Sequence, residues 1–117
     1  MREWIPDAGD IVWVDLNPTV GHEQAGKRPA LVLSPASYNA KTSLLLACAM
    51  TLEVKGYPFE VALTPGGGVT GVVLADQVRS LDWRARNADA ATRAPAAVVS
   101  DVLAKLSVLL APTPAGG

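Results

Sequence analysis

The sequence has few of the residue types on which much enzyme chemistry depends. Its 117 residues include one cysteine, one histidine and six aromatic side chains, namely three Trp, two Tyr and one Phe. The single cysteine, Cys48, excludes an internal disulfide and offers none of the paired spacings of a zinc site. Cys48 lies in an apolar run, so we expect a buried core thiol. Because aromatic residues are scarce, Val, Leu and Ala must fill the core.

An excess of positive charge is also missing. The 10 Lys and Arg residues face 11 Asp and Glu residues, which gives a formal net charge of -1. Proteins that coat nucleic acid without sequence preference are usually far more basic, because phosphate neutralisation drives such binding. Any nucleic-acid site in this chain must therefore be a local cluster of positive charge.

Long apolar runs and compact acidic clusters are absent as well. No stretch approaches the length of a membrane span, and the first residues carry no apolar signal region. We therefore expect a cytoplasmic protein with no membrane partner. The sequence offers no compact carboxylate cluster that would hold a divalent metal, so we expect no metal and no cofactor.

The chain does contain enough apolar residues for one core. They make up 50% of the sequence, and the length fits a single domain over residues 1–117, with an ordered part of about 6–110. Short runs rich in branched residues, separated by Pro, Gly and Asn, indicate β-strands. We expect strands at 11–15, 30–34, 44–48, 59–63, 71–75 and 77–81, a turn at 65–68, and a short helical or turn segment at 37–41.

The last part of the chain has a different period. From Pro95, a favourable first helical position, apolar side chains recur every three or four residues, which indicates an amphipathic helix that ends at Pro112 and Pro114. Its apolar stripe consists of Val98, Val99, Val102, Leu103, Leu106, Leu109 and Leu110. Short strands followed by this helix predict a mainly β fold, a small barrel or curved antiparallel sheet with a C-terminal α-helix.

Four segments within this pattern carry a family resemblance. They are PDAGDIVWVD at 6–15, GHEQAGKRP at 21–29, KGYPFE at 55–60 and GVVLADQV at 71–78, and WRAR follows at 83–86. In this order and spacing they resemble the MazF/PemK family of toxin ribonucleases over nearly the whole chain. The block EQAGKRP at 23–29 is the most specific element, and ADQ at 75–77 supports it.

The resemblance implies an SH3-like barrel, a homodimer, and an acidic, partly disordered antitoxin as partner. It also implies a metal-independent endoribonuclease that cuts single-stranded RNA at a short sequence, with an ACA-containing site as the best expectation. Cleavage would use the neighbouring 2′-hydroxyl of the RNA and leave a 2′,3′-cyclic phosphate and a 5′-hydroxyl. Translation and growth would be inhibited.

Such a reaction needs proton transfer at two ribose oxygens and donors for the charge that grows on the phosphorane. The resemblance assigns charge stabilisation to Arg28, whose guanidinium can fork onto phosphate oxygens, with Thr51 as a hydroxyl donor. Glu23 is either a general base or a partner that orients Arg28, and His22 is either a proton carrier or an accessory residue. Without the motif, these would be an arginine before a strand, a strand-end threonine and two solvated loop residues.

One position departs from the family pattern. The branch with a histidine at the place of His22 pairs it with an arginine two positions before the Asp of the ADQ block, and here that position is Leu74. The mechanism built on that trio does not transfer whole. Asp76 is therefore either a catalytic carboxylate or a structural one at a strand junction, and Arg28 with Thr51 is the safer assignment.

Recognition of RNA needs unstacked bases read by aromatic and polar side chains. Trp13 is either a core residue or a base platform, and Gln77 either reads a base edge or is solvated at a strand edge. Arg84 and Arg86 face either phosphate or a salt bridge across the dimer. The full candidate set for RNA binding is Trp13, Lys27, Asn39, Asp76, Gln77, Arg79, Arg84 and Arg86.

Two other functions fit the same fold class. A toxin that poisons a DNA topoisomerase would need a tryptophan near the end of the C-terminal helix, but residues 95–117 contain no aromatic residue. A non-catalytic SH3-like binding module is the second alternative, because a fold alone does not fix a function. In that case Glu23, Arg28 and Thr51 would be ordinary surface residues.

Overall fold

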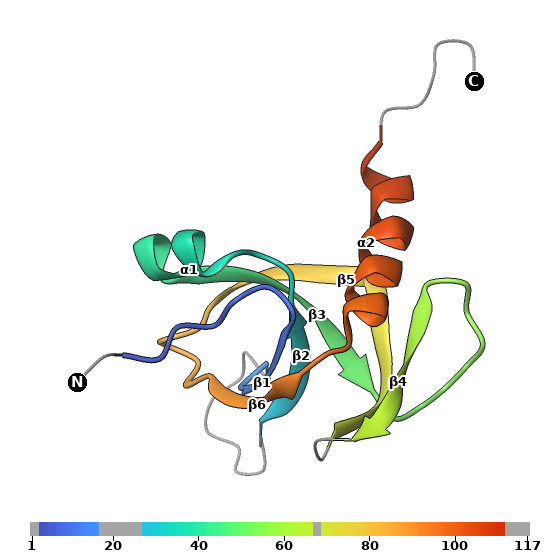
Figure 1. The fold of residues 1–117 in the computed structure, drawn as a ribbon, viewed down its shortest axis with the longest axis horizontal. Helices are drawn as coiled ribbons and strands as arrows, with labels where there is room; N and C mark the ends of the chain where they lie inside the picture. The colour runs from blue at the N-terminus through green and yellow to red at the C-terminus, as the bar shows by residue number, and fades with distance from the viewer. Residues whose placement is uncertain (1–2, 17–26, 67–68, 112–117) are drawn as a thin grey trace.

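The computed structural model describes residues 3–16, 27–66 and 69–111. Within these ranges the chain forms six strands and two helices (Figure 1). In chain order they are β1 (Asp10–Val14), β2 (Arg28–Val32), α1 (Ala36–Thr42), β3 (Leu44–Thr51), β4 (Glu60–Gly66), β5 (Val69–Asp82), β6 (Asp89–Arg93) and α2 (Ala96–Leu110).

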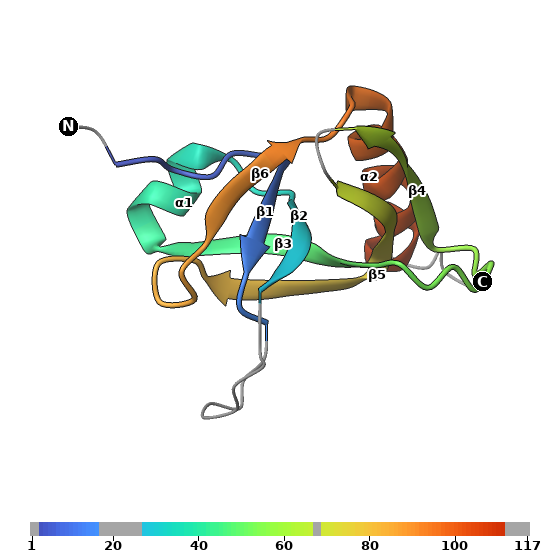
Figure 2. The same ribbon diagram turned by 90° about the horizontal axis from the view of Figure 1, so that it is seen from below.

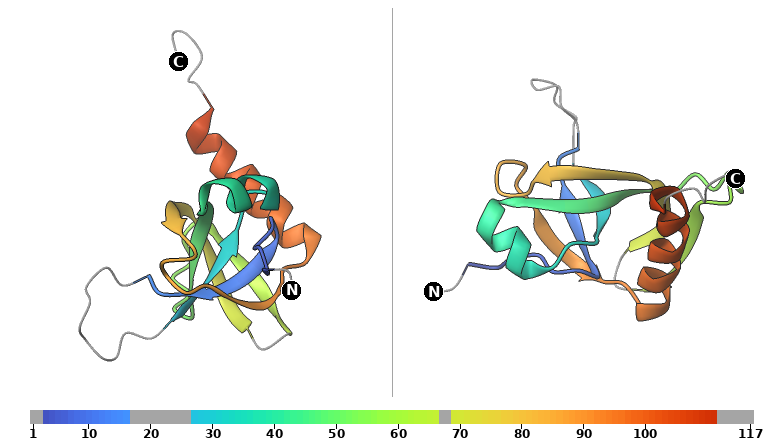
Figure 3. Two further views of the ribbon diagram at one scale, coloured as in Figure 1. Left: turned by 90° about the vertical axis from the view of Figure 1, so that its left-hand side faces the viewer. Right: turned by 90° about the horizontal axis from the view of Figure 1, so that it is seen from above.

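The strands form one antiparallel sheet in the order β4-β5-β3-β2-β1-β6. The sheet is strongly curved. Strands β3 and β5 run along the molecule from the α1 end, past β1, β2 and β6, to β4 and α2 at the other end (Figure 2). The views along the other axes show α1 and α2 on the same side of this sheet, well apart (Figure 3). A mainly β fold with a curved antiparallel sheet and a C-terminal helix confirms the predicted fold class.

Both faces of the sheet are covered, so alternate residues of one strand belong to different cores. Ile11 and Leu31 belong to a cluster closed by Val98 and Val102 of α2. Their strand neighbours belong to a second cluster, made of strand residues and Trp83. Two buried faces explain why these strands read as continuous apolar runs instead of alternating ones.

Cys48 is confirmed as a buried core thiol. Its side chain has no exposed surface and belongs to the cluster under α2. The sulfur lies 3.8 Å from the carbonyl oxygen of Ala75. Burial, with a smaller contribution from the negative charge of Asp76, raises the pKa of the Cys48 thiol to about 11.

Strand β5 is one long strand where the sequence predicted two. Cys48 pairs with Val78 and Met50 pairs with Val73, so two steps along β3 correspond to five along β5. The extra residues form a bulge at the junction where the sequence placed Asp76. A bulge bends a strand and redirects its side chains, and here both Asp76 and Gln77 are exposed. The two predicted strands are therefore the two arms of a single bent strand.

The sequence does not predict β6, because DAATR at 89–93 lacks the branched apolar and aromatic residues that mark a strand. It forms at the sheet edge by backbone pairing with β1, where Ile11 faces Thr92 and Trp13 faces Asp89. None of its five residues is buried. Backbone pairing, rather than side-chain burial, therefore determines this strand.

Both predicted helical segments are helices, but the apolar stripe of α2 is only partly used. Val98, Val102 and Leu106 are buried, whereas Leu103, Leu109 and Leu110 are exposed. The C-terminal half of α2 extends beyond the sheet, which explains the difference (Figure 1). Among the described residues, no helix has the length and apolar character needed to cross a membrane.

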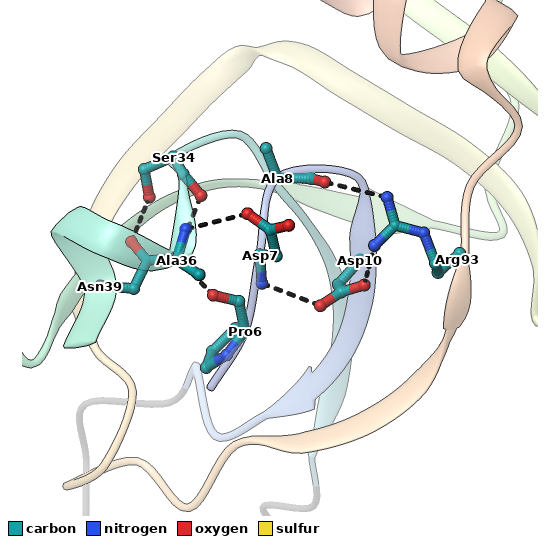
Figure 4. Close-up of polar contacts among 8 residues, drawn as sticks. All are labelled: Pro6, Asp7, Ala8, Asp10, Ser34, Ala36, Asn39 and Arg93. Atoms are coloured by element: carbon teal, nitrogen blue, oxygen red, sulfur yellow. Dashed lines mark hydrogen bonds and ion pairs between the residues drawn. The ribbon is translucent and has the colours of Figure 1, made fainter. Parts of the chain in front are cut away.

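Asn39 is a correction to the predicted RNA-binding set. Its side chain, on α1, is fully buried. The side-chain amide donates to the carbonyl oxygens of Pro6 at 2.8 Å and Ser34 at 3.0 Å, and its oxygen accepts from the Ser34 hydroxyl at 2.6 Å (Figure 4). The bond to Pro6 ties the N-terminal segment to α1, and the two bonds with Ser34 tie α1 to the residues that follow β2. Asn39 is therefore a structural residue, closed off from solvent.

The PDAGD segment at 6–10 adds further contacts to these bonds. We call the contacts of this segment with Asn39 and the start of α1 the N-terminal clamp. Helix α1 begins after Pro35 without a capping side chain from its own sequence. Asp7 supplies the cap from a distance, since its carboxylate accepts from the backbone N–H of Ala36 at 2.9 Å. Asp10 accepts from the N–H of Asp7 at 2.8 Å and pairs with Arg93 of β6 (Figure 4). The segment thus joins α1, β1 and β6.

Candidate active site

A cavity of 510 Å³ opens where strands β1, β2 and β3 meet. Its lining brings together four of the predicted site residues: Trp13 from β1, Lys27 and Arg28 at the start of β2, and Thr51 at the end of β3. The rest of its wall is Pro29, Met50, Leu52, Glu53 and Thr70. We call this cavity the Arg28 pocket.

Strand pairing explains why Arg28 and Thr51 meet. Ala30 of β2 faces Ala49 of β3, and two further steps in this antiparallel register bring Arg28 level with Thr51. Arg28 is exposed and Thr51 is half-buried. The guanidinium of Arg28 and the hydroxyl of Thr51 therefore line the same pocket, although 22 residues of sequence lie between them.

The hydroxyl of Thr51 is already oriented. Its oxygen accepts a hydrogen bond of 3.1 Å from the backbone N–H of Glu53. A hydroxyl that accepts in this way keeps its own hydrogen free to donate. Thr51 can therefore donate to a phosphate oxygen in the pocket, while Arg28 presents up to five N–H groups in a planar fork.

Gly71 permits the close approach behind Thr51. It lies in β5 beside the Thr51–Val72 pair and has a φ of +126°. A Cβ atom on this residue would lie 2.5 Å from the carbonyl oxygen of Thr51. A side chain at position 71 would push the backbone of Thr51 away, so this glycine fixes where the hydroxyl sits.

A second, smaller cavity of 190 Å³ adjoins the first. Thr51 and Glu53 line both cavities. The second contains Asp76 and Gln77, which the bulge in β5 brings to its wall. Its other lining residues are Lys55, Tyr57, Phe59, Glu60 and Leu74. We call it the Asp76 pocket.

Three of the other predicted cations contact groups within the protein. Lys27 forms an ion pair with Asp89 of β6. Arg84 makes a two-pronged ion pair with Glu3, both contacts at 2.9 Å, and lies 4.2 Å above the ring of Trp83. That hydrogen-bonded pair holds the pKa of the Glu3 carboxyl below its usual range and raises the pKa of Arg84. Arg84 lines a separate open cleft, so it does not join the Arg28 pocket.

Arg86 and Arg79 also lie apart from the two pockets. Arg86 is half-buried and donates to the carbonyl oxygen of Asp15 at 2.8 Å, which braces the end of β1. Arg79 is exposed on β5 and lines neither the Arg28 pocket nor the Asp76 pocket. Among the described residues, three of the seven predicted lysine, arginine and amide side chains line these pockets: Lys27, Arg28 and Gln77.

Two predicted catalytic residues, His22 and Glu23, lie outside the described residues. The segment that carries them joins β1 to β2, and β2 begins at Arg28. Within the described ranges, no group of three or more His, Cys, Asp and Glu side chains could hold a metal ion.

Sequence reasoning missed three residues that shape the pockets: Gly71, Glu53 and Glu60. Glu53 supplies the N–H that orients Thr51, and Glu60 supports the loop between the pockets. The signal for Glu60 was present, because it closes the KGYPFE segment at 55–60. Gly71 gave a weaker signal as a glycine inside a strand, where a close backbone approach is a usual cause.

Comparison with known proteins assigns the chain to a family. A family model described as PemK-like, MazF-like toxin of type II toxin–antitoxin system matches residues 7–110. The chain is 50% identical over 110 residues to the endoribonuclease toxin MazF of Escherichia coli (strain K12), with 94% of this chain and 98% of that protein covered.

Solved structures agree with this match. The crystal structure of MazF (Form-I) from Deinococcus radiodurans superposes with a TM-score of 0.85 at 55% identity and covers 94% of this chain and 100% of that one. A MazE-MazF structure (Form-II) from the same organism gives 0.84 at 50% identity, covering 95% and 100%. The chain belongs to the PemK-like, MazF-like toxins of type II toxin–antitoxin systems.

Proposed function

We propose that this MazF-like endoribonuclease toxin cuts single-stranded RNA in the cytoplasm at a short, ACA-containing sequence, without a metal ion, and so stops translation and growth. The observation that carries the proposal is the Arg28 pocket. An exposed guanidinium and a hydroxyl with a free hydrogen face the same cavity there. These are the two kinds of donor that a phosphate in the act of cleavage requires.

In the proposed reaction, the RNA supplies its own nucleophile. The 2′-oxygen of a ribose attacks the adjacent phosphorus and its proton passes to a base. The bond between phosphorus and the 5′-oxygen then breaks, and an acid protonates that oxygen. The products are a 2′,3′-cyclic phosphate and a 5′-hydroxyl.

Arg28 and Thr51 stabilise the phosphorane in this scheme. Extra negative charge grows on the non-bridging oxygens as the 2′-oxygen attacks. The hydrogen bonds from both donors become stronger as that charge grows. A guanidinium is a permanent cation, so the side chain of Arg28 fits charge stabilisation better than proton abstraction. Glu23 and His22 are the proposed proton-transfer groups, with Asp76 as a third carboxylate in the neighbouring pocket.

We also propose that the toxin is a homodimer and is silenced by an acidic, extended antitoxin. The Deinococcus radiodurans structure pairs MazF with MazE, which supports a partner of this kind. In this chain, the exposed guanidinium of Arg28 would attract acidic side chains. Inhibition by such a partner is expected to weaken as salt rises.

The decisive experiment incubates the purified protein with a long single-stranded RNA in EDTA and maps the ends of the fragments. We expect cutting at a short common sequence, 2′,3′-cyclic phosphate ends, and no cutting of the same sequence as DNA, which lacks the 2′-hydroxyl. Arg28→Ala is expected to lower kcat/KM about a thousandfold. Lys41→Ala, which removes an exposed positive charge on α1, is the matched control and should cut normally.

Two results would contradict the proposal. Fragments with a 3′-hydroxyl end would mean that water or another nucleophile, and not the 2′-oxygen, attacks phosphorus. Normal turnover by Arg28→Ala would remove the pocket from the reaction.

A further inference from the structure

Glu60 is a carboxylate whose two oxygens are both used inside the protein. One oxygen accepts from the backbone N–H of Lys55 at 3.0 Å and the other from that of Gly56 at 2.9 Å. The N–H of Glu60 itself donates to the carbonyl oxygen of Tyr57 at 3.1 Å. Three hydrogen bonds thus join the first residue of β4 to the loop that precedes it.

That loop, residues 52–59, is the wall between the two pockets. Leu52 and Glu53 line the Arg28 pocket, and Lys55 and Tyr57 line the Asp76 pocket. Its other end is held by the hydrogen bond from Glu53 to the Thr51 hydroxyl. The loop is therefore held at three places: at the Thr51 hydroxyl, at Glu60, and at Phe59, whose carbonyl oxygen accepts a 2.9 Å hydrogen bond from the N–H of Ala75.

Apart from Phe59 at its end, which packs against the core, the loop has little apolar packing to hold its shape. Leu52, Val54 and Tyr57 are between 61% and 77% exposed, and Gly56 has a φ of +82° with no atom within 4 Å of where its Cβ would be. The Gly56 conformation is therefore set by the turn and not by crowding. A carboxylate that receives two backbone N–H groups is a charge-assisted clamp, which is stronger than ordinary neutral hydrogen bonds.

Tyr57 is exposed and lines the Asp76 pocket together with Glu60. An exposed aromatic ring next to a phosphate-binding pocket is a typical surface for stacking a base of single-stranded RNA. Since Glu60 holds the Tyr57 carbonyl and the two residues before it, Glu60 determines where that ring and the loop backbone stand relative to Arg28 and Thr51.

We propose that Glu60 is a specificity-determining positioning residue: its carboxylate clamps the loop at 52–59 so that the loop admits one RNA sequence beside the Arg28 pocket. This inference rests on the proposed ribonuclease function. Glu60 takes no part in proton transfer, because both of its oxygens are engaged by the loop. Its loss is expected to relax the choice of sequence while the reaction at phosphorus continues.

The test compares wild type with Glu60→Gln and Glu60→Ala. Gln keeps one acceptor but turns an N–H donor toward the second amide, and Ala removes both acceptors. Asp101→Asn is the matched control, because it changes an exposed carboxylate on α2, away from the loop. Kinetics are measured on one RNA with the preferred site and on a second RNA with one base changed.

For Glu60→Gln we expect the ratio of kcat/KM between the two RNAs to fall about tenfold, through a higher KM on the preferred site. The kcat should stay within about threefold of wild type, because Arg28 and Thr51 are unchanged. Glu60→Ala should show a larger loss of discrimination, and Asp101→Asn should show none. Fragment-end mapping on a long RNA should reveal added cut sites in the Glu60 variants.

Amide hydrogen exchange supplies a measurement that does not depend on activity. The Lys55 and Gly56 amides should exchange at least about tenfold faster in Glu60→Gln than in wild type. If exchange and sequence choice both match wild type, the inference is wrong. Equal losses of kcat on both RNAs with unchanged discrimination would also overturn it. If wild type cuts no RNA, both the proposed function and the inference are wrong. If wild type is selective and Glu60→Gln is equally selective, only the inference is wrong.

A variant that does not fold is distinguished in the same experiment. Glu60→Asp retains the charge on a shorter stem and reaches the loop less well. It should fold like wild type and lie between wild type and Glu60→Gln in both exchange and discrimination. Glu60→Asp could show wild-type amide exchange with relaxed sequence choice, or faster exchange with wild-type sequence choice. Either result would mean that the clamp and the sequence choice are unconnected, and the inference would be wrong.

Discussion

Polar side chains at the two ends of β1 differ in whether they are bonded to partners within the protein. At the N-terminal end, Asp7, Asp10 and Asn39 are bonded to partners within the protein, and the side chain of Asn39 is completely buried. At the other end, Arg28 is exposed and Thr51 keeps a hydrogen to donate. Both ends carry segments of the family motif. A recognisable motif can therefore mark a set of internal contacts or an open pocket, and the hydrogen-bond partners of its side chains distinguish the two.

The sharpest test of this comparison is Thr51→Val, which removes the hydroxyl but keeps the shape. We expect kcat/KM to fall about a hundredfold because one donor to the phosphorane is lost. Thr51→Ser should recover most of the activity, since it restores the hydroxyl and its bond to the Glu53 N–H. Single-turnover cleavage of a short RNA is the measurement. Equal activity of the Val and Ser variants would show that the hydroxyl is not used.

The opposite pattern is expected at the N-terminal clamp. Asn39→Ala leaves the Pro6 and Ser34 partners unsatisfied inside the protein, which should lower the free energy of unfolding by about 2–3 kcal/mol. Urea denaturation measures this loss. Cleavage per folded molecule should stay normal at low temperature. A variant of normal stability but lower activity would mean that Asn39 serves cleavage and not the stability of the fold.

Gly71→Ala tests whether stability and cleavage activity both depend on one residue. The added Cβ would meet the Thr51 carbonyl oxygen at 2.5 Å, so the strand must shift. We expect a loss of about 1–2 kcal/mol in stability and a drop of about tenfold in kcat/KM. Thermal unfolding and cleavage assays on the same preparation give both numbers. Val72→Ala, one residue further on, creates a small cavity without moving the Thr51 carbonyl, so it should lower stability alone.

The smallest expected effect concerns the Glu3–Arg84 pair. The hydrogen-bonded Arg84 guanidinium lowers the pKa of the Glu3 carboxyl in the folded protein. A lowered folded pKa means that the pair stabilises the fold above the ordinary Glu pKa and loses this effect as pH falls through the lowered value. The difference in Tm between wild type and Glu3→Gln should therefore be present at neutral pH and vanish in acid. A difference that persists or grows in acid would contradict the pairing.

The same contrast explains how far the sequence could be read. Strands with branched apolar residues and the first half of α2 were predictable because burial on two faces imposes a clear pattern. The meeting of Arg28 with Thr51 followed from the family motif, and the strand register accounts for it. β6 was not predictable, because its pairing uses the backbone of DAATR and little side-chain burial.

Side-chain partners distant in sequence were the other limit. Nothing local to Asn39 indicates that Pro6 will cover it, and nothing local to Arg84 indicates Glu3, 81 residues away. A polar residue on a short helix or after a tryptophan reads as exposed until its partner is known. The sequence alone therefore could not separate polar side chains held by distant partners from those left exposed at the pockets.

The lone, buried thiol of Cys48 has a practical consequence. With its pKa raised to about 11, it stays protonated and shielded near neutral pH, and thiolate is the form that reacts with maleimides. A cysteine introduced by Glu53→Cys would then be the one site that takes a fluorescent label. No background cysteine then needs to be removed before the loop is labelled, and the proposed homodimer would carry one dye on each subunit.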